Sequence, residues 1–147
     1  MKDRWDDRYL DLAKHFSTWS KDPSRQIGAV AIGSKGQVLS QGYNGFPRGI
    51  FDTSERYEDK PTKYKYVVHA EMNCIYNAMF HGTSLANSTL YVYGLPVCSD
   101  CAKGIIQVGI TRVVTPKLDD TIPQLWIDST ELTKSMFREA NVVYNFI

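Results

Sequence analysis

The sequence predicts a single layered α/β domain spanning residues 1–147 and built around a central mixed sheet. Two observations support this prediction. Short β-rich segments alternate with helical segments along the chain, a pattern that favours parallel pairing between some of the strands. The composition, with 43% hydrophobic and 22% charged residues, is typical of an ordinary globular protein, and the length suits one hydrophobic core.

The N-terminal part of the chain predicts a helix followed by a hairpin. The helix is expected over residues 3–19, where apolar residues recur every three or four positions and form one face. Residues 27–33 and 37–43 are β-rich and are separated by SKG, which predicts the hairpin. The apolar residues of the helix are Trp5, Tyr9, Leu12, Ala13, Phe16 and Trp19.

Residues 44–67 form a long stretch without clear periodicity, rich in Gly, Pro, Tyr and charged residues. Irregular segments of this length inside a small domain are usually functional or disordered. Alternation then resumes, with a helix expected over residues 69–82 that ends at Gly82, a suitable C-cap. The remaining elements are expected to be a strand at 88–94, a helix at 99–109, a strand at 111–116, a helix at 129–140 and a final strand at 141–147.

The bulk properties narrow the class of partner and the compartment. A net charge of +1 indicates no dedicated binder of nucleic acid or membranes, so a small anionic ligand is the better candidate. The charged N-terminus does not resemble a signal peptide, and no apolar run is long enough to cross a membrane. Three cysteines without a secretory signal indicate a reducing compartment. We therefore expect a cytoplasmic protein.

Cys98 and Cys101 stand at CxxC spacing in LPVCSDCAKGII, at the start of a predicted helix. Such a pair forms a disulfide, a redox couple or two metal ligands, and the reducing compartment argues against the disulfide. His69 opens the preceding predicted helix, so side-by-side packing of the two helices would bring one imidazole and two thiolates together. Helix N-termini lower thiolate pKa values and offset the negative charge of the sulfurs.

Three protein ligands leave the fourth tetrahedral position of zinc open to water, as in catalytic zinc sites. Glu71 lies two residues from His69 and can accept a proton from that water. The alternatives are a redox pair, although the HAE segment has no place in one, and a structural zinc module, which needs a fourth ligand. The remaining candidates for a fourth ligand are unsuitable: Cys74 lies too far along its helix and is expected to be buried, and His15 and His81 are expected at the surface or as caps.

The segments SKDPSRQIGAVAI, GYNGFPRG, YVVHAEMNCI and CAKGIIQVGI, in this order across residues 5–116, resemble the deoxycytidylate (dCMP) deaminases, including those of bacteriophages. The resemblance implies a cytidine-deaminase-like three-layer α/β/α sandwich, one zinc ion per subunit and hydrolysis of dCMP to dUMP and ammonia for thymidylate synthesis. It also implies a homo-oligomer, with a hexamer favoured, and regulation by dCTP and dTTP at a subunit interface that involves GYNG.

The same resemblance suggests substrate contacts. Glu71 would carry the water proton to N3 of cytosine, and the Ala70 N–H would bind the pyrimidine O2. Asn44 would contact the sugar, although Asn-Gly also forms ordinary turns. Tyr64 and Tyr66 either close over the base or pack beneath the loop. The local candidates for binding the phosphate are Lys21, Ser24, Arg25 and Arg48, each of which could instead be an ordinary solvated side chain.

Val97 is a departure from the family pattern, which usually has proline directly before the first cysteine. The extra residue is expected to alter how the loop that carries Cys98 approaches the base. Alternatives to a dCMP deaminase are a related zinc deaminase acting on another cytosine compound or on a tRNA adenosine, and a non-catalytic nucleotide sensor. The near-neutral charge and GYNG argue against tRNA, and Glu71 argues against the sensor, because pure binding needs no proton acceptor beside an open metal.

Overall fold

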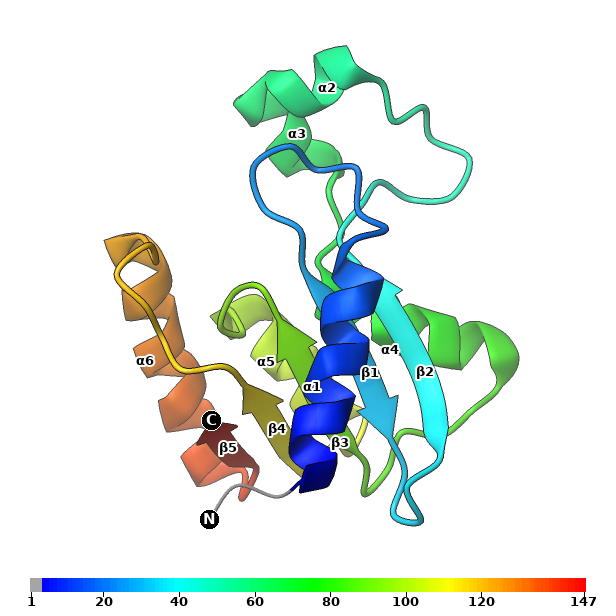
Figure 1. Cartoon of the computed structure of the whole chain (residues 1–147), viewed down its shortest axis with the longest axis vertical. Coiled ribbons are helices and arrows are strands. Elements are labelled where there is room, and N and C mark those ends of the chain that lie inside the picture. Colours follow the sequence, from blue (N-terminus) through cyan, green and yellow to red (C-terminus); the bar gives the residue numbers. More distant parts are fainter. Residues whose placement is uncertain (1–3) are drawn as a thin grey trace.

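The computed structural model describes residues 4–147, which form a five-stranded mixed sheet with the strand order β2-β1-β3-β4-β5 (Figure 1). β1 pairs antiparallel with both β2 and β3, whereas β3, β4 and β5 are parallel. The strands span Gly28–Ile32 (β1), Val38–Tyr43 (β2), Thr89–Tyr93 (β3), Arg112–Thr115 (β4) and Val143–Phe146 (β5).

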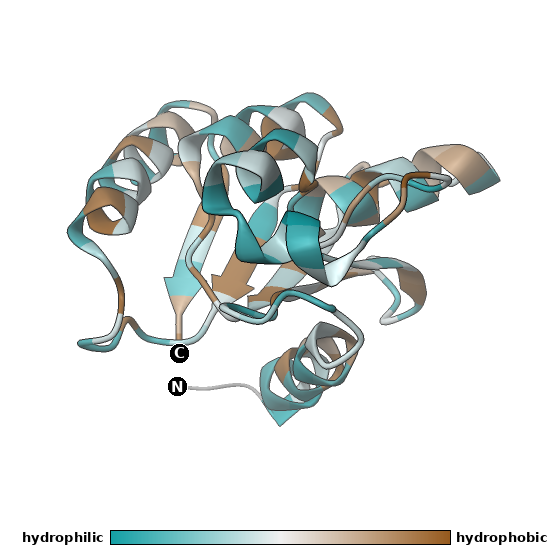
Figure 2. Ribbon diagram, turned by 90° about the horizontal axis from the view of Figure 1, so that it is seen from above, coloured by the Kyte–Doolittle hydropathy of each residue, from teal (hydrophilic) through white to brown (hydrophobic). Residues whose placement is uncertain are grey.

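Helices cover both faces of this sheet, which confirms the predicted three-layer α/β/α sandwich. Val30, Tyr91 and Val114 pack with Ala13 on the face covered by α1, while Ala29 and the opposite sides of the strands pack against the other helices. Figure 2 shows the helix beside the N-terminus alone on one side of the sheet. The helices on the other face are α4 (Ala70–His81), α5 (Ser99–Gln107) and α6 (Gln124–Glu139), and α1 is Arg4–Ser17.

The stretch expected to be irregular contains two short helices, α2 (Ser54–Glu58) and α3 (Lys60–Tyr66), which lie beyond one end of the sheet (Figure 1). Helices this short cannot show an apolar period, so the sequence pattern did not reveal them. Local signals are nevertheless present, because the Thr53 hydroxyl accepts a hydrogen bond from the Arg56 N–H and Pro61 lies in the first turn of α3.

Two other helix boundaries differ from the prediction. The last helix begins at Gln124, five residues before the expected start at residue 129. The first helix ends at Ser17 rather than at residue 19, and residue 3 lies outside the described part of the chain. Within residues 4–147, none of the helices combines the length and the apolar character needed to cross a membrane.

The topology brings the starts of α4 and α5 together at the carboxyl ends of β2 and β3. Because β1 is antiparallel to both of its neighbours, β2 and β3 run in the same direction, and their carboxyl ends lie at the same edge. α5 starts just after β3, and α4 lies directly on β2. Gly42 makes this approach possible, since a Cβ there would lie 2.3 Å from the Cys74 backbone nitrogen and 2.6 Å from the Ala70 carbonyl oxygen.

Candidate metal centre and active site

His69, Cys98 and Cys101 meet where the N-termini of α4 and α5 come together. His69 is the N-cap residue of α4 and Cys98 is the N-cap residue of α5, both with extended backbone. The His69 Nδ1 atom lies 3.4 Å from each of the two Sγ atoms, and the three ligand atoms all lie within 4.8 Å of one another. A tetrahedral zinc ion with ordinary Zn–N and Zn–S bonds separates nitrogen and sulfur ligands by about 3.5 Å. The three side chains therefore fit zinc without rearrangement.

The electrostatics of this group also suit a cation. Hydrogen bonding from the Cys101 thiol and from His69 lowers the pKa of Cys98 to about 4, and the Cys101 backbone N–H also donates to the Cys98 sulfur. The hydrogen bond to the Cys98 sulfur in turn raises the pKa of His69 to about 9, and the hydrogen bond to Cys98, together with burial, raises the pKa of Cys101. This pattern of pKa shifts favours negative charge on Cys98, and metal binding would release any proton held by His69 or by the Cys101 thiol.

Glu71 is buried in the first turn of α4, two residues beyond His69. Burial raises the pKa of its carboxyl group to about 7. A carboxyl group that titrates near neutral pH can both accept and return a proton, which is the property that a general acid–base catalyst needs.

A cavity of about 250 Å³ lies beside His69 and Glu71. One part of its lining is His69, Ala70, Glu71 and Trp126, whose ring centroid lies 5.9 Å from that of His69. The other part is polar and mostly cationic, and its members come from the loop after α1, from the residue that follows β2 and from α3: Asp22, Ser24, Arg25, Asn44, Lys60, Lys63 and Tyr64.

Four of the sequence-predicted substrate contacts line this cavity: Asn44, Ala70, Ser24 and Arg25. The Asn44 amide also holds the neighbouring loop, since its Oδ1 accepts from the Ile27 N–H and its Nδ2 donates to the Arg25 carbonyl. The Arg25 guanidinium donates to the carbonyl oxygens of Thr121 and Gly94. Their proposed contacts with sugar and phosphate stay predictions.

Lys21, Arg48 and Tyr66 are not brought to this cavity. The exposed ammonium group of Lys21 pairs with Asp52 at 2.9 Å. Arg48 donates to the Asn77 side chain and lines a different cavity, over the outer side of α4. The Tyr66 ring packs against Phe46 and lies beneath the Arg56 guanidinium, so of the two alternatives it takes the packing one. These three residues are close in sequence to residues that line the cavity, but the chain turns between them and directs their side chains elsewhere.

The sequence prediction missed Lys60, Lys63 and Trp126. Lys60 and Lys63 belong to α3, which was expected to be irregular, and Trp126 lies before the expected start of the last helix. Tyr64, left undecided between two roles, lines the cavity and is exposed. The charged DKPTKYK segment was the available signal for the lysines, but nothing in its pattern indicated which side chains face inward.

The three residues that the sequence analysis rejected as a fourth metal ligand lie where they were expected. Cys74 is buried in the core, and burial raises the pKa of its thiol to about 12. His15 and His81 are exposed, at or near the ends of α1 and α4. All three cysteines are free of disulfides.

Val97 is fully buried, and both its backbone N–H and its backbone carbonyl form hydrogen bonds. Its N–H donates to the Tyr144 hydroxyl at 3.0 Å, and its carbonyl accepts from the Thr133 hydroxyl at 2.9 Å. The extra residue before Cys98 is therefore accommodated in the core, against β5 and α6.

An imidazole and two thiolates at paired helix N-termini, beside a buried glutamate that is not part of the ligand group, define the class of zinc-dependent hydrolytic deaminases. The chain belongs to the cytidine and deoxycytidylate deaminase family. The family model described as "Cytidine and deoxycytidylate deaminase zinc-binding region" matches residues 3–117, which include the three candidate ligands.

Individual relatives agree with this assignment. The chain is 34% identical over 142 residues to an uncharacterized deaminase of Aliivibrio fischeri, covering 97% of this chain and 92% of the relative. It is 34% identical over 149 residues to the human deoxycytidylate deaminase, covering 95% and 78% of the two chains. The crystal structure of the cyanophage S-TIM5 dCMP deaminase in complex with dCMP and dUMP superposes with a TM-score of 0.78 over 100% and 99% of the chains, and at 22% identity this shows a shared fold.

Proposed function

We propose that this chain, as a single domain, hydrolyses dCMP to dUMP and ammonia and so provides dUMP for thymidylate synthesis. The observation that carries the proposal is the cavity lined by the candidate ligand His69 and by Glu71 together with a group of cations and hydroxyls. The first part suits the cytosine ring and the second suits a 5′-phosphate. The relatives named as deoxycytidylate deaminases support this choice of substrate.

The protein groups divide the chemistry between them. Zinc held by His69, Cys98 and Cys101 supplies Lewis acidity, which lowers the pKa of a coordinated water to about 7. Glu71 accepts a proton from the water that adds to C4 of cytosine and delivers it to N3. It then takes the proton of the new C4 hydroxyl and gives it to the amino group, so that the C4–N4 bond breaks, ammonia leaves and the C4 carbonyl of dUMP forms. The Ala70 backbone N–H lies in the first turn of α4, where it has no helical partner, and in this proposal it binds the O2 atom.

Recognition of the phosphate falls to the second part of the cavity. Lys60 offers an exposed ammonium group from the first turn of α3. Arg25 offers a guanidinium group that now bonds to the carbonyl of Thr121 at the exposed loop before α6. Ser24 offers a hydroxyl group on the same loop as Arg25. Charge-assisted hydrogen bonds from such groups to a phosphate are roughly twice as strong as neutral ones.

The decisive experiment is a comparison of CMP, dCMP, deoxycytidine and dCTP as substrates, followed by the loss of cytosine absorbance. We expect dCMP to have the highest kcat/KM, with deoxycytidine lower by at least about tenfold, because it forgoes the interactions with the phosphate. Equal rates on dCMP and deoxycytidine would contradict the proposed substrate. Turnover of neither would contradict the proposed reaction.

Three further features of the proposal concern assembly, regulation and compartment. A homo-oligomer is supported by the exposed apolar side chains of Tyr76, Met79 and Phe80 on α4, whereas the preference for a hexamer rests on the family resemblance alone. Regulation by dCTP and dTTP is supported by a second cavity of about 420 Å³ that includes Tyr43, Gly45 and Arg48. A cytoplasmic location suits thiolates that must stay reduced. The molar mass in solution, and the effect of each nucleotide on the dCMP rate, test the first two.

A further inference from the structure

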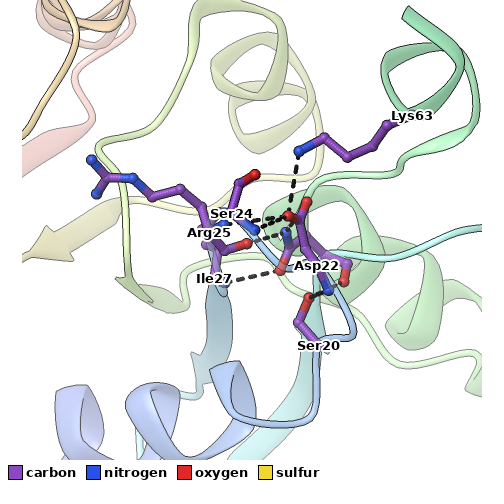
Figure 3. Close-up of polar contacts among 7 residues, drawn as sticks. Ser20, Asp22, Ser24, Arg25, Ile27 and Lys63 are labelled. Carbon is purple, nitrogen blue, oxygen red and sulfur yellow. Dashed lines mark hydrogen bonds and ion pairs between the residues drawn. The ribbon is translucent and has the colours of Figure 1, made fainter. Parts of the chain in front are cut away.

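Asp22 places a buried carboxylate in the wall of the cavity, in the loop formed by residues 20–27. This carboxylate organises the loop. Its Oδ1 accepts hydrogen bonds from the backbone N–H groups of Ser24 at 2.8 Å and of Arg25 at 3.3 Å (Figure 3). The two residues that we assign to the phosphate are therefore held in position by the Asp22 side chain.

Lys63 supplies the charge that opposes this carboxylate. Its Nζ atom lies 3.3 Å from Asp22 Oδ1, and the two side chains are only 6% and 5% exposed. Figure 3 shows Lys63 reaching from α3 toward Asp22, while the Arg25 guanidinium points away from that carboxylate. The pair thus links α3, an element that the sequence pattern did not reveal, to the loop that follows α1.

A buried carboxylate creates a difficulty for a site that must accept a phosphate. Like charges brought together in a poorly solvated cavity repel strongly, and solvent screens them little. The difficulty affects a nucleotide but not the corresponding nucleoside, which carries no charge. A cation that cancels the carboxylate removes the repulsion and leaves the hydrogen bonds to the loop intact.

We propose that Lys63 determines the preference for a phosphorylated substrate, by neutralising the Asp22 carboxylate that holds Ser24 and Arg25 at the cavity. Lys63 acts through Asp22 rather than on the phosphate itself, since its buried ammonium group is already committed to that carboxylate. It is a positioning and charge-compensating residue. This inference rests on the proposed function, because it assumes that the substrate carries a 5′-phosphate.

The test measures kcat/KM for dCMP and for deoxycytidine in four proteins: wild type, Lys63→Met, the double variant Asp22→Asn/Lys63→Met, and the control Lys65→Met. Lys65 is an exposed lysine of the same helix that does not line the cavity. Asparagine at position 22 keeps an oxygen that can accept from the Ser24 and Arg25 N–H groups but carries no charge. The double variant therefore restores neutrality without restoring Lys63.

We expect Lys63→Met to lower the dCMP-to-deoxycytidine ratio of kcat/KM by at least about tenfold, mainly through a higher KM for dCMP, because an uncancelled buried charge repels the phosphate. The double variant recovers most of this loss, and Lys65→Met has the wild-type ratio. The proposal would be overturned if the ratio stays low in the double variant. It would also be overturned if Lys63→Met lowers kcat/KM equally for both substrates and so leaves the ratio unchanged.

Two further arms keep the outcome interpretable. If Lys63→Met does not fold, Lys63→Gln replaces it, since glutamine removes the charge but still offers Asp22 a hydrogen-bond donor, and the same fall in the ratio is expected. If wild type shows no preference for dCMP, the proposed function itself fails. A wild-type preference for dCMP that persists in the Lys63 variant overturns only the role of Lys63.

Discussion

Glu71 concentrates the acid–base chemistry of the site in one side chain. Its carboxyl group is buried, has a pKa near neutrality and lies outside the group of three candidate ligands. We expect Glu71→Gln to lower kcat for dCMP by about 10²–10⁴-fold, the usual contribution of a positioned general base, while the zinc content stays that of wild type. Absorbance kinetics and metal analysis of the purified variant measure the two effects.

The control for this prediction is Glu139→Gln, an exposed glutamate at the end of α6 that is expected to leave kcat unchanged. A Glu71→Gln protein with wild-type kcat would exclude the proton-transfer role. Loss of zinc together with activity would instead make Glu71 part of the metal site.

The role of a residue could be predicted where a short motif indicates both the spacing of the functional side chains and the helix on which they lie. Outside such motifs it could not. His69 and Glu71 lie at the start of α4, and Cys98 and Cys101 lie at the start of α5. Their approach was therefore predictable once the two helices were expected to pack side by side with their N-termini together. Lys21 and Arg48 belong to loops, where the side-chain direction depends on tertiary contacts such as the Asp52 ion pair. Lys60 and Lys63 were missed because a short helix leaves no periodic signal.

At the scale of elements, one buried carboxylate adds polar contacts to the apolar packing of α1 on the sheet. Asp6 accepts two hydrogen bonds from the Arg112 guanidinium, at 2.9 and 2.7 Å, and a third from the Tyr91 hydroxyl. The hydrogen bonds from Arg112, more than any other cause, lower the pKa of Asp6 below 3.8. We expect Asp6→Asn to lower the free energy of unfolding at pH 7 by about 2 kcal/mol, as is typical for losing hydrogen bonds to a charged group.

The pH dependence of this effect has a definite sign. Because the pKa of Asp6 is lower in the folded protein than in the unfolded chain, its stabilisation is complete above about pH 5 and disappears as the pH falls through the folded-state pKa. Urea unfolding of wild type and variant at pH 7 and pH 2.5 should therefore show a smaller difference in acid. Asp11→Asn, at an exposed position of α1, is the control; an equal difference at both pH values would contradict the assignment.

The elements at the C-terminus support the loop that carries the cysteines. Tyr144 of β5 accepts the Val97 N–H, and Ser129 of α6 accepts the Ser99 N–H at 2.9 Å. We expect Tyr144→Phe to leave a buried N–H unpaired, lowering the free energy of unfolding by about 1–2 kcal/mol. Zinc affinity should fall by about tenfold, the lower end of the effect of outer-shell partners, because the loop before Cys98 loosens.

Competition with a chelator measures the affinity in this comparison. Tyr9→Phe is a matched control, since its hydroxyl also bonds to a backbone group, the Gly36 carbonyl, but far from the cysteines. Unchanged zinc affinity in Tyr144→Phe would show that the loop is held without this bond.

For the whole molecule, the layer order was predictable because alternating helices and strands leave few ways to bury every apolar face. The order of the strands within the sheet was harder to predict from this alternation than the order of the layers. β2 and β3 both pair with β1, and only that arrangement aligns their carboxyl ends and brings α4 beside α5. The cationic part of the cavity was the least predictable, because α3 meets the loop after α1 through long-range contacts such as Lys63 with Asp22.

Zinc should tie two helices of an already folded domain together. One ligand comes from the start of α4 and two come from the start of α5, while the core formed by both helices and the sheet contains many apolar residues besides Cys98 and Cys101. We therefore expect the chelated protein to remain folded but with a lower Tm. Free zinc at 1,000 times its Kd should raise the free energy of unfolding by about 4 kcal/mol.

Thermal unfolding followed by circular dichroism, with added zinc and with chelator, tests this expectation. Cys101→Ser provides the control: it removes one thiolate, so its Tm should respond far less to either addition. Complete unfolding of wild type on chelation would mean that the metal is required for the fold, as in zinc fingers. A wild-type Tm that is indifferent to zinc would contradict the three-ligand site. A rise in Tm confined to wild type would show that His69, Cys98 and Cys101 act as one site joining α4 to α5.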